Sequence, residues 1–245
     1  MPKLICIAPG HGGFDPGAVA NGFMEKNFTL GIGLALRGYL EAAGVPVVMT
    51  RTGDYAAGHA TTVMGDLENE CAIANNAKAD LFMCIHINAS TDTAATGAQS
   101  FVYRSGGPSE QLATQLTDAL GPALGVRQPP AVVDPGLYVL AHTTMSAVLT
   151  ECGFITNPTQ AVWLNAHLDE VAQLLSGPLI AWAGGTVVTP PTDIAGQPYA
   201  QAVEWAMQAG LMTATNGQFQ PDNPILRWEL AVVLERFNTY LAKKG

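Results

Sequence analysis

The sequence has 245 residues, of which 48% are hydrophobic and 13% are charged, and its formal net charge is −9. This composition is typical of a globular protein with one sizeable core and a small appendage, and it excludes a largely disordered chain. The negative charge, with no clusters of Lys or Arg, argues against binding to nucleic acid, because a phosphate backbone would repel the protein.

Short β-branched runs alternate with longer amphipathic segments in the first part of the chain. This alternation predicts an α/β domain with a mostly parallel twisted sheet flanked by helices. The predicted strands are Leu4–Ala8, Val45–Thr50, Leu81–Ile87, Ala98–Tyr103, Leu137–Leu140 and Ala147–Thr150. The predicted helices, each with apolar residues on one face, are Glu25–Ala43, Thr62–Ala77, Ser109–Leu124 and His167–Ala183. We expect residues 1–183 to form the catalytic domain described below.

The composition changes after Trp182, where glycines and paired prolines without helical periodicity indicate a linker over residues 184–197. Residues 198–245 predict a small α-helical C-terminal domain with helices at Tyr199–Gly210 and Arg227–Leu241. The second helix carries one apolar face, made by Leu230, Val233, Leu234, Phe237 and Leu241. A unit of about 50 residues is marginal alone, so we expect it to pack on a partner copy or on the first domain.

Cysteine spacing, apolar stretches and the N-terminal residues indicate the compartment in which the protein is made. The four cysteines, Cys6, Cys71, Cys84 and Cys152, show no CxxC spacing and predict free, largely buried thiols. No apolar stretch reaches the roughly 18 residues that span a bilayer. The first residues predict a strand and not a signal peptide, so we expect synthesis in the cytoplasm without an export signal.

A candidate metal site comes from three residues at the ends of predicted elements. His11 follows the first strand in a glycine-rich loop, Glu25 begins the first helix, and His86 ends the apolar run Leu81–Ile85. The carboxyl edge of an open α/β sheet is where sites are built. Two histidines and one carboxylate form a common catalytic zinc set that leaves a fourth position open, whereas magnesium and calcium prefer oxygen ligands.

Other titratable residues receive different interpretations. Glu151 ends a buried apolar strand, where burial would raise its pKa towards neutrality and suit it to accept and donate a proton. The remaining histidines, His59, His142 and His167, are expected to be surface or loop residues. For His142 the alternative is a position near the cleft.

These residues belong to an ordered set of motifs that resembles the zinc-dependent N-acetylmuramoyl-L-alanine amidases of the amidase type 3 family. The motifs are His11-Gly12-Gly13, Glu25-Lys26-Asn27, Thr50-Arg51, Ala74-Asn75, Ala79-Asp80-Leu81, Ile85-His86-Ile87-Asn88-Ala89 and Glu151-Cys152-Gly153-Phe154-Ile155-Thr156-Asn157. The resemblance runs from Ile5 to about Trp182. It departs at Glu70, where such amidases often carry an arginine.

The resemblance implies one Zn²⁺ per catalytic domain, held by His11, Glu25 and His86, with Glu151 as the catalytic acid and base. The implied substrate is peptidoglycan, cleaved at the amide between N-acetylmuramic acid and the L-alanine of the stem peptide. Asn88 and Asn157, which lie in the same motifs, are predicted to contact the substrate.

The C-terminal part resembles one S-layer homology motif: a helix, a Gly-x-Phe-x-Pro loop at Gly217–Pro221, and an Arg-x-Glu helix start at Arg227. Such modules bind wall polymers, so the implied partner is a secondary cell-wall polymer, with homodimerisation as the alternative. Leu226 stands where the family often has a helix-capping threonine. Trp205 and Trp228 are candidates for stacking on sugar or for core packing.

Three classes of function follow. The first is a phage or prophage endolysin that reaches the wall through a holin-made hole. The second is a host amidase of sporulation or wall turnover, released by cell lysis. The third is a non-enzymatic wall-binding protein with a degenerate amidase fold, which the intact set of His11, Glu25, His86 and Glu151 disfavours.

Overall fold

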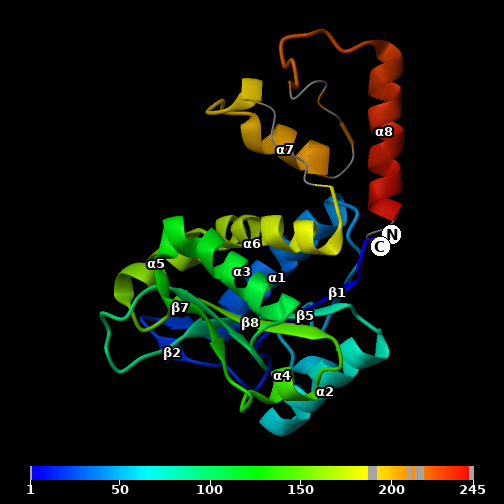
Figure 1. Ribbon diagram of the computed structural model, residues 1–245. Coiled ribbons are helices and arrows are strands. Elements are labelled where there is room, and N and C mark those ends of the chain that lie inside the picture. Colours follow the sequence, from blue (N-terminus) through cyan, green and yellow to red (C-terminus); the bar gives the residue numbers. More distant parts are fainter. Residues whose placement is uncertain (1, 187–191, 209–210, 213, 215–217, 243–245) are drawn as a thin grey trace. The chain divides into compact units, whose positions relative to one another are not determined.

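The structure is a computed structural model that describes residues 2–186, 192–208, 211–212, 214 and 218–242 (Figure 1). The chain divides into two compact units, Met1–Gly185 and Thr186–Gly245, and the division falls inside the linker predicted at residues 184–197. Residues 187–191 of that linker lie outside the described residues. Among the described residues, no helix has the length and apolarity needed to cross a membrane.

The first unit is built on a six-stranded sheet with the order β4-β1-β5-β8-β6-β7. The strands are β1 (Ile5–Pro9), β4 (Val47–Met49), β5 (Leu81–Asn88), β6 (Ala98–Val102), β7 (Val126–Val133) and β8 (Ser146–Phe154). Strands β4, β1, β5 and β8 run parallel, β6 is antiparallel to β8, and β7 is parallel to β6. The mostly parallel sheet predicted from the sequence is therefore confirmed.

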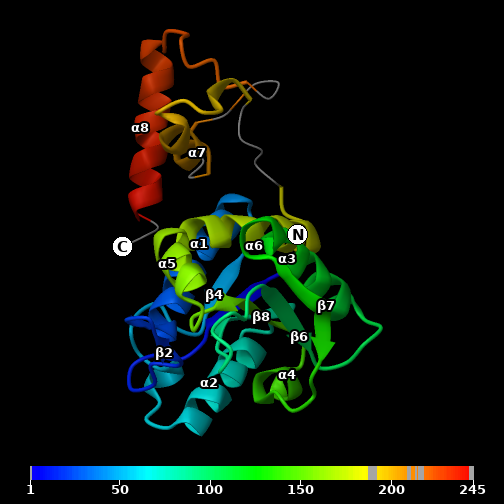
Figure 2. The ribbon, with the colours of Figure 1, turned by 90° about the vertical axis from the view of Figure 1, so that its left-hand side faces the viewer.

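Helices cover both faces of this sheet (Figures 1 and 2). One face carries α1 (Glu25–Ala42), α3 (Pro108–Leu124), α5 (Pro158–Ala166) and α6 (Leu168–Ala183), and the other carries α2 (Val63–Asn76) and α4 (Tyr138–His142). Alternate residues of β5 enter the two cores: Met83 faces the first set of helices, and Cys84 the second. Burial on both faces explains why this strand is a continuous apolar run. All four cysteines are free and buried, as predicted.

Several elements differ from the prediction, among them helix α5, which was not expected. The predicted strand Leu137–Leu140 is wrong, because these residues lead into and form the short helix α4; a short apolar run does not distinguish the two by periodicity. Strand β7 was not expected, since Pro129 and Pro130 argue against a strand, yet it lies at the sheet edge where proline is tolerated. The hairpin of β2 (Val19–Ala20) and β3 (Phe23–Met24) is too short to carry a pattern.

The second unit contains a 3₁₀ turn, η2 (Thr192–Ile194), and the helices α7 (Ala200–Gln208) and α8 (Arg227–Ala242), close to the two helices predicted there. Glu229 supplies the cap at the start of α8, because its side chain accepts a hydrogen bond from the Leu226 N–H at 2.7 Å. The apolar face of α8 is largely open: Leu230, Leu234, Phe237 and Leu241 are 38–58% exposed.

Of the two tryptophans predicted to stack on sugar or to pack in the core, the structure describes the side chain of Trp205 alone. Trp205 is 47% exposed and contacts the ring of Tyr240 edge-on at 6.1 Å. The side chain of Trp228 and Gly217, the first residue of the predicted Gly-x-Phe-x-Pro loop, lie outside the described residues.

Candidate active site

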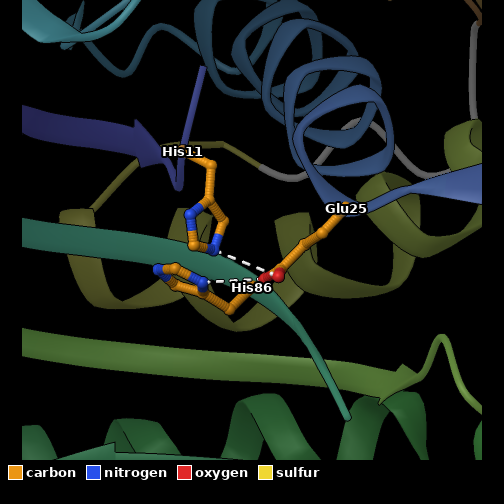
Figure 3. Close-up of side chains that lie close together, drawn as sticks. All are labelled: His11, Glu25 and His86. Carbon is orange, nitrogen blue, oxygen red and sulfur yellow. Dashed lines mark hydrogen bonds and ion pairs between the residues drawn. The ribbon is translucent and has the colours of Figure 1, made fainter. Parts of the chain in front are cut away.

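Three chain segments meet at one edge of the sheet to form the site (Figure 3). His11 lies just beyond β1, and His86 lies near the end of β5, the strand that pairs with β1 in parallel. Parallel neighbours end at the same edge, so the two imidazoles come together there. The β2–β3 hairpin returns the chain to this edge, where α1 begins with Glu25.

The Glu25 carboxylate lies between the two imidazoles. Its Oε2 is 3.1 Å from His11 Nε2, and its Oε1 is 2.8 Å from His86 Nδ1. One ligand atom from each of the three residues lies within 4.8 Å of the others. Ligands about 2.1 Å from a tetrahedral zinc ion are about 3.4 Å apart. The three ligand atoms therefore lie near this spacing, with no pair more than 4.8 Å apart.

Two glycines leave room for these side chains. A Cβ on Gly10 would lie 2.3 Å from Cε1 of His86, and a Cβ on Gly17 would lie 2.5 Å from Cδ2 of His11 and 2.6 Å from Oε2 of Glu25. Real Cβ atoms do not approach other atoms so closely, so a side chain at either position would displace a ligand. Gly17 also has a φ of 66°, which favours glycine.

Backbone groups hold the Glu25 carboxylate in place. The N–H of Ala18 donates to Oε2 at 2.9 Å, and the N–H of Ile87 donates to Oε1 at 3.0 Å. Burial alone would raise the pKa of Glu25, but its hydrogen bonds and charge interactions with His11 and His86 outweigh burial and lower that pKa. Glu25 is therefore an anion at neutral pH, as a metal ligand must be.

Asp15 orients the first histidine, a role that the sequence interpretation missed. Its Oδ2 accepts a hydrogen bond from His11 Nδ1 at 2.8 Å, and its Oδ1 accepts one from the Gly17 N–H at 2.9 Å. This leaves His11 Nε2 to face Glu25, the arrangement common in metal sites. Burial would lower the pKa of His11, but Glu25 and Asp15 together raise it to about 9 in the metal-free protein. A carboxylate four residues after a loop histidine was the available signal.

Arg51 joins the two segments that carry His11 and Glu25. It is 2% exposed, and its guanidinium donates to the carbonyl oxygens of Pro9 at 2.9 Å, Gly10 at 3.1 Å and Lys26 at 2.8 Å. The first two acceptors precede His11 and the third follows Glu25. Arg51 thereby sets the distance between these ligands, which its place in a Thr-Arg motif did not reveal.

Glu151 lies beside the three ligands on the neighbouring strand β8, where it pairs in register with His86. Its Oε2 is buried and has no hydrogen-bond partner in the part of the chain that the structure describes. Burial raises the pKa of Glu151 to about 7, with the nearby His86 opposing the shift and Glu25 reinforcing it. A carboxyl group with this pKa exchanges a proton readily at neutral pH.

The two predicted substrate contacts, Asn157 and Asn88, differ in the number of hydrogen bonds that their side chains make within the protein. Asn157 Oδ1 caps α5 by accepting from the N–H groups of Thr159 and Gln160, and its Nδ2 donates to the Ala95 carbonyl at 3.1 Å. The Asn88 side chain accepts from the next backbone N–H, that of Ala89, at 2.8 Å. Both residues lie at the carboxyl edge of the sheet, but neither contact tests a substrate role.

Glu70 and His142 are the two other residues singled out from the sequence. Glu70 is buried on α2, where burial, with a smaller contribution from Asp66, raises its pKa to about 7, and the charges of His86 and His11 oppose the shift. His142 ends α4 and precedes Ser146, which starts β8 at the edge opposite to Glu151. The place near the cleft that the sequence allowed for His142 is therefore wrong.

Comparison with known proteins identifies the architecture. The family model described as N-acetylmuramoyl-L-alanine amidase (Amidase_3) matches residues 5–176. The chain belongs to this family. It is similar to the germination-specific N-acetylmuramoyl-L-alanine amidase of Bacillus subtilis, at 34% identity over 178 residues that cover 69% of this chain and 75% of that amidase.

Two further similar proteins show the range of the matches. The endolysin of Bacillus phage SPP1 is 35% identical over 184 residues, covering 71% of this chain but only 63% of the endolysin. The solved structure of the CwlD amidase from Clostridioides difficile, in complex with the GerS lipoprotein, superposes with a TM-score of 0.66 at 26% identity, covering 74% of this chain and 98% of that one. The residues matched by the family model, 5–176, lie within the first unit.

Proposed function

We propose that this amidase-family protein is a zinc-dependent peptidoglycan hydrolase that cleaves the amide between N-acetylmuramic acid and the L-alanine of the stem peptide. Amidase activity on peptidoglycan follows from its family. The zinc dependence rests on one observation: two imidazoles and a carboxylate converge at the sheet edge, and a buried carboxyl oxygen of Glu151 without a partner lies on the next strand.

The donor set fits zinc. His11, Glu25 and His86 supply two nitrogens and one oxygen, which suits zinc better than magnesium or calcium and leaves a position open. When bound, zinc supplies a Lewis acid that activates water and polarises the scissile carbonyl. Asp15 holds the tautomer of His11, and the backbone N–H groups of Ala18 and Ile87 hold Glu25.

Glu151 performs the proton transfers in this proposal. With a pKa of about 7, its carboxylate is populated enough to accept the proton of the attacking water. The same carboxyl then donates that proton to the departing alanine nitrogen, which is a poor leaving group without it. We include Asn88 and Asn157 as substrate contacts at the same edge.

A wall-digestion experiment tests the activity. Purified walls incubated with the protein are expected to release new alanine N-termini without new reducing sugars, and prior treatment with a chelator followed by zinc should remove and restore this release. New reducing ends would instead identify a glycosidase. Release that persists in the chelated protein would refute the zinc dependence.

The biological setting is a second part of the proposal. We favour an endolysin released through a holin-made hole, and the similarity to a phage endolysin supports it. The alternative is a host amidase, supported by the similarity to a germination-specific enzyme. A holin gene beside the coding sequence would favour the first setting, and a sporulation operon would favour the second.

We assign residues 198–245 a wall-anchoring role through a secondary cell-wall polymer, with homodimerisation through the exposed face of α8 as the alternative. Removal of residues 190–245 separates the two roles. Loss of sedimentation with walls supports anchoring, whereas unchanged sedimentation together with a halved molecular mass in solution supports dimerisation.

A further inference from the structure

The first unit contains three histidines that stack on an aromatic residue four positions earlier. The pairs are Tyr55–His59, Tyr138–His142 and Trp163–His167, with ring centroids 4.6, 3.8 and 4.5 Å apart. Helix geometry explains the last two, because residues four apart lie on the same face of α4 and at the end of α5. In both, the histidine Nδ1 also contacts the carbonyl oxygen of its aromatic partner.

The Tyr55–His59 stack has no such explanation. It lies in a loop with one 3₁₀ turn, η1 (Ala57–His59), in which Gly58 and His59 have φ values of 59° and 56°. This left-handed backbone is strained for histidine, and such strain persists where the surrounding structure imposes it, often at functional sites. His59 is exposed, and its imidazole nitrogens have no hydrogen-bond partner among the described residues.

Contacts from two sides hold the stack rigidly. The Tyr55 hydroxyl accepts a hydrogen bond from the Thr52 N–H at 3.0 Å and bonds the Thr52 hydroxyl at 2.9 Å. The Ala57 N–H donates to the Asp66 carboxylate, and the Ala57 carbonyl accepts from the Asn69 side chain at 2.9 Å. An exposed loop braced in this way is suited to binding without loss of order.

The same loop lies directly against the loop that carries the ligand His11. Asp54 accepts from the Gly13 N–H at 2.8 Å and pairs with Lys26 at 2.9 Å. A Cβ on Gly12 would come within 2.5 Å of the Tyr55 carbonyl oxygen, so the two backbones are in close contact. The stack is therefore attached to the edge of the candidate active site.

We propose that Tyr55 and His59 form a carbohydrate subsite that binds an N-acetylated sugar ring of the glycan strand next to the scissile amide. This assignment rests on the proposed function. A pyranose presents a C–H face that packs on an aromatic ring, and its hydroxyl and acetamido groups suit the unpartnered imidazole nitrogens. The charged groups nearby, Asp54 and Lys26, are paired with each other, which disfavours the charged stem peptide as the occupant.

The test measures binding of N-acetylated chitotetraose, a sugar without peptide, to the full-length protein by calorimetry and by NMR titration. His59→Ala is expected to weaken binding about fivefold, the cost of removing one ring contact. His142→Ala is the matched control, because it removes a similar stack at the opposite edge of the sheet and should leave binding unchanged. His59→Gly, which suits the left-handed backbone, keeps the loop folded and should reproduce the loss.

Three results would overturn the subsite: no measurable binding to the unaltered protein, equal binding by both His59 variants and the unaltered protein, or an equal loss in His142→Ala. The measurement needs no turnover. A protein that binds sugar through His59 but releases no alanine N-termini would refute the amidase function alone, whereas an active amidase indifferent to His59 would refute the subsite alone.

Discussion

Polar side chains of the same kinds have different roles at the amino and carboxyl edges of the sheet. At the amino edge, Asp80 accepts from the Leu4 N–H at 2.8 Å, and Asn75 bridges the His142 carbonyl and the Thr144 N–H. Each of these polar side chains bonds backbone and closes a loop. At the carboxyl edge, Glu25 bonds two imidazoles as well as backbone, and Glu151 keeps one buried oxygen without a partner.

The side chains of the amino edge therefore stabilise the fold, whereas those of the carboxyl edge are suited to chemistry. Hydrogen bonds from side chains to backbone groups satisfy the polar atoms of buried or bent chain segments. A buried carboxyl group that bonds other titratable side chains, or that has no hydrogen-bond partner, has a strongly shifted pKa. Such a group is able to bind a cation or to transfer a proton. The four predictions that follow test this contrast, starting with the largest expected effect.

Replacement of Glu151 by glutamine is expected to lower the rate of wall hydrolysis about 10²- to 10⁴-fold, because the amide cannot accept the water proton. The zinc content should not change, since Glu151 is not among the ligands. Release of alanine N-termini and metal analysis measure the two effects. An active Glu151→Gln protein would remove Glu151 from the mechanism.

Replacement of Asp15 by alanine is expected to weaken zinc binding about 10- to 100-fold, because His11 loses the partner that orients its ring. Competition with a chromophoric chelator measures the dissociation constant. Asp80→Ala, at the amino edge, is the matched control and should leave zinc affinity intact. Equal affinities for Asp15→Ala and the unaltered protein would show that the loop alone orients His11.

The unpartnered carboxyl of Glu151 should also cost stability as it ionises. Its folded pKa of about 7 lies above the ordinary value of 4.5, so the native state binds more protons between these pH values. Its contribution is therefore lost as pH rises through this range. Above pH 7, metal-free Glu151→Gln is expected to be more stable than metal-free unaltered protein by roughly 1–3 kcal/mol. Urea unfolding at pH 4 and 8 checks this, with no difference expected at pH 4.

The smallest effect on activity is expected at the amino edge. Asn75→Ala removes the hydrogen bonds to His142 and Thr144 and should lower the free energy of unfolding by about 1 kcal/mol. Wall hydrolysis at a temperature where the variant is folded should stay within about twofold of the unaltered rate, because no contact with the site is lost. A larger loss of activity would show that the two edges are coupled.

Much of the fold was predictable because local patterns carried it. The amphipathic helices α1, α2, α3 and α6 and the apolar strands β1 and β5 followed their periodicity within a few residues. Prediction failed where the pattern was short or misleading, as at α4, or where position in the sheet decided the outcome, as for the prolines of β7. A proline is acceptable in a strand only if that strand lies at an edge, which depends on the whole sheet.

The sequence by itself determined which side chains meet at the candidate site. His11, Glu25, His86 and Glu151 each stand at the end or start of a strongly patterned element, and parallel strands bring such positions to one edge. Only the tertiary structure decided how these residues are held and spaced. Arg51 joins segments distant in sequence, the Ile87 N–H reaches Glu25 from another strand, and Glu151 keeps a buried oxygen without a partner among the described residues. Hydrogen-bond geometry and burial depend on contacts between distant segments, and no local pattern contains them.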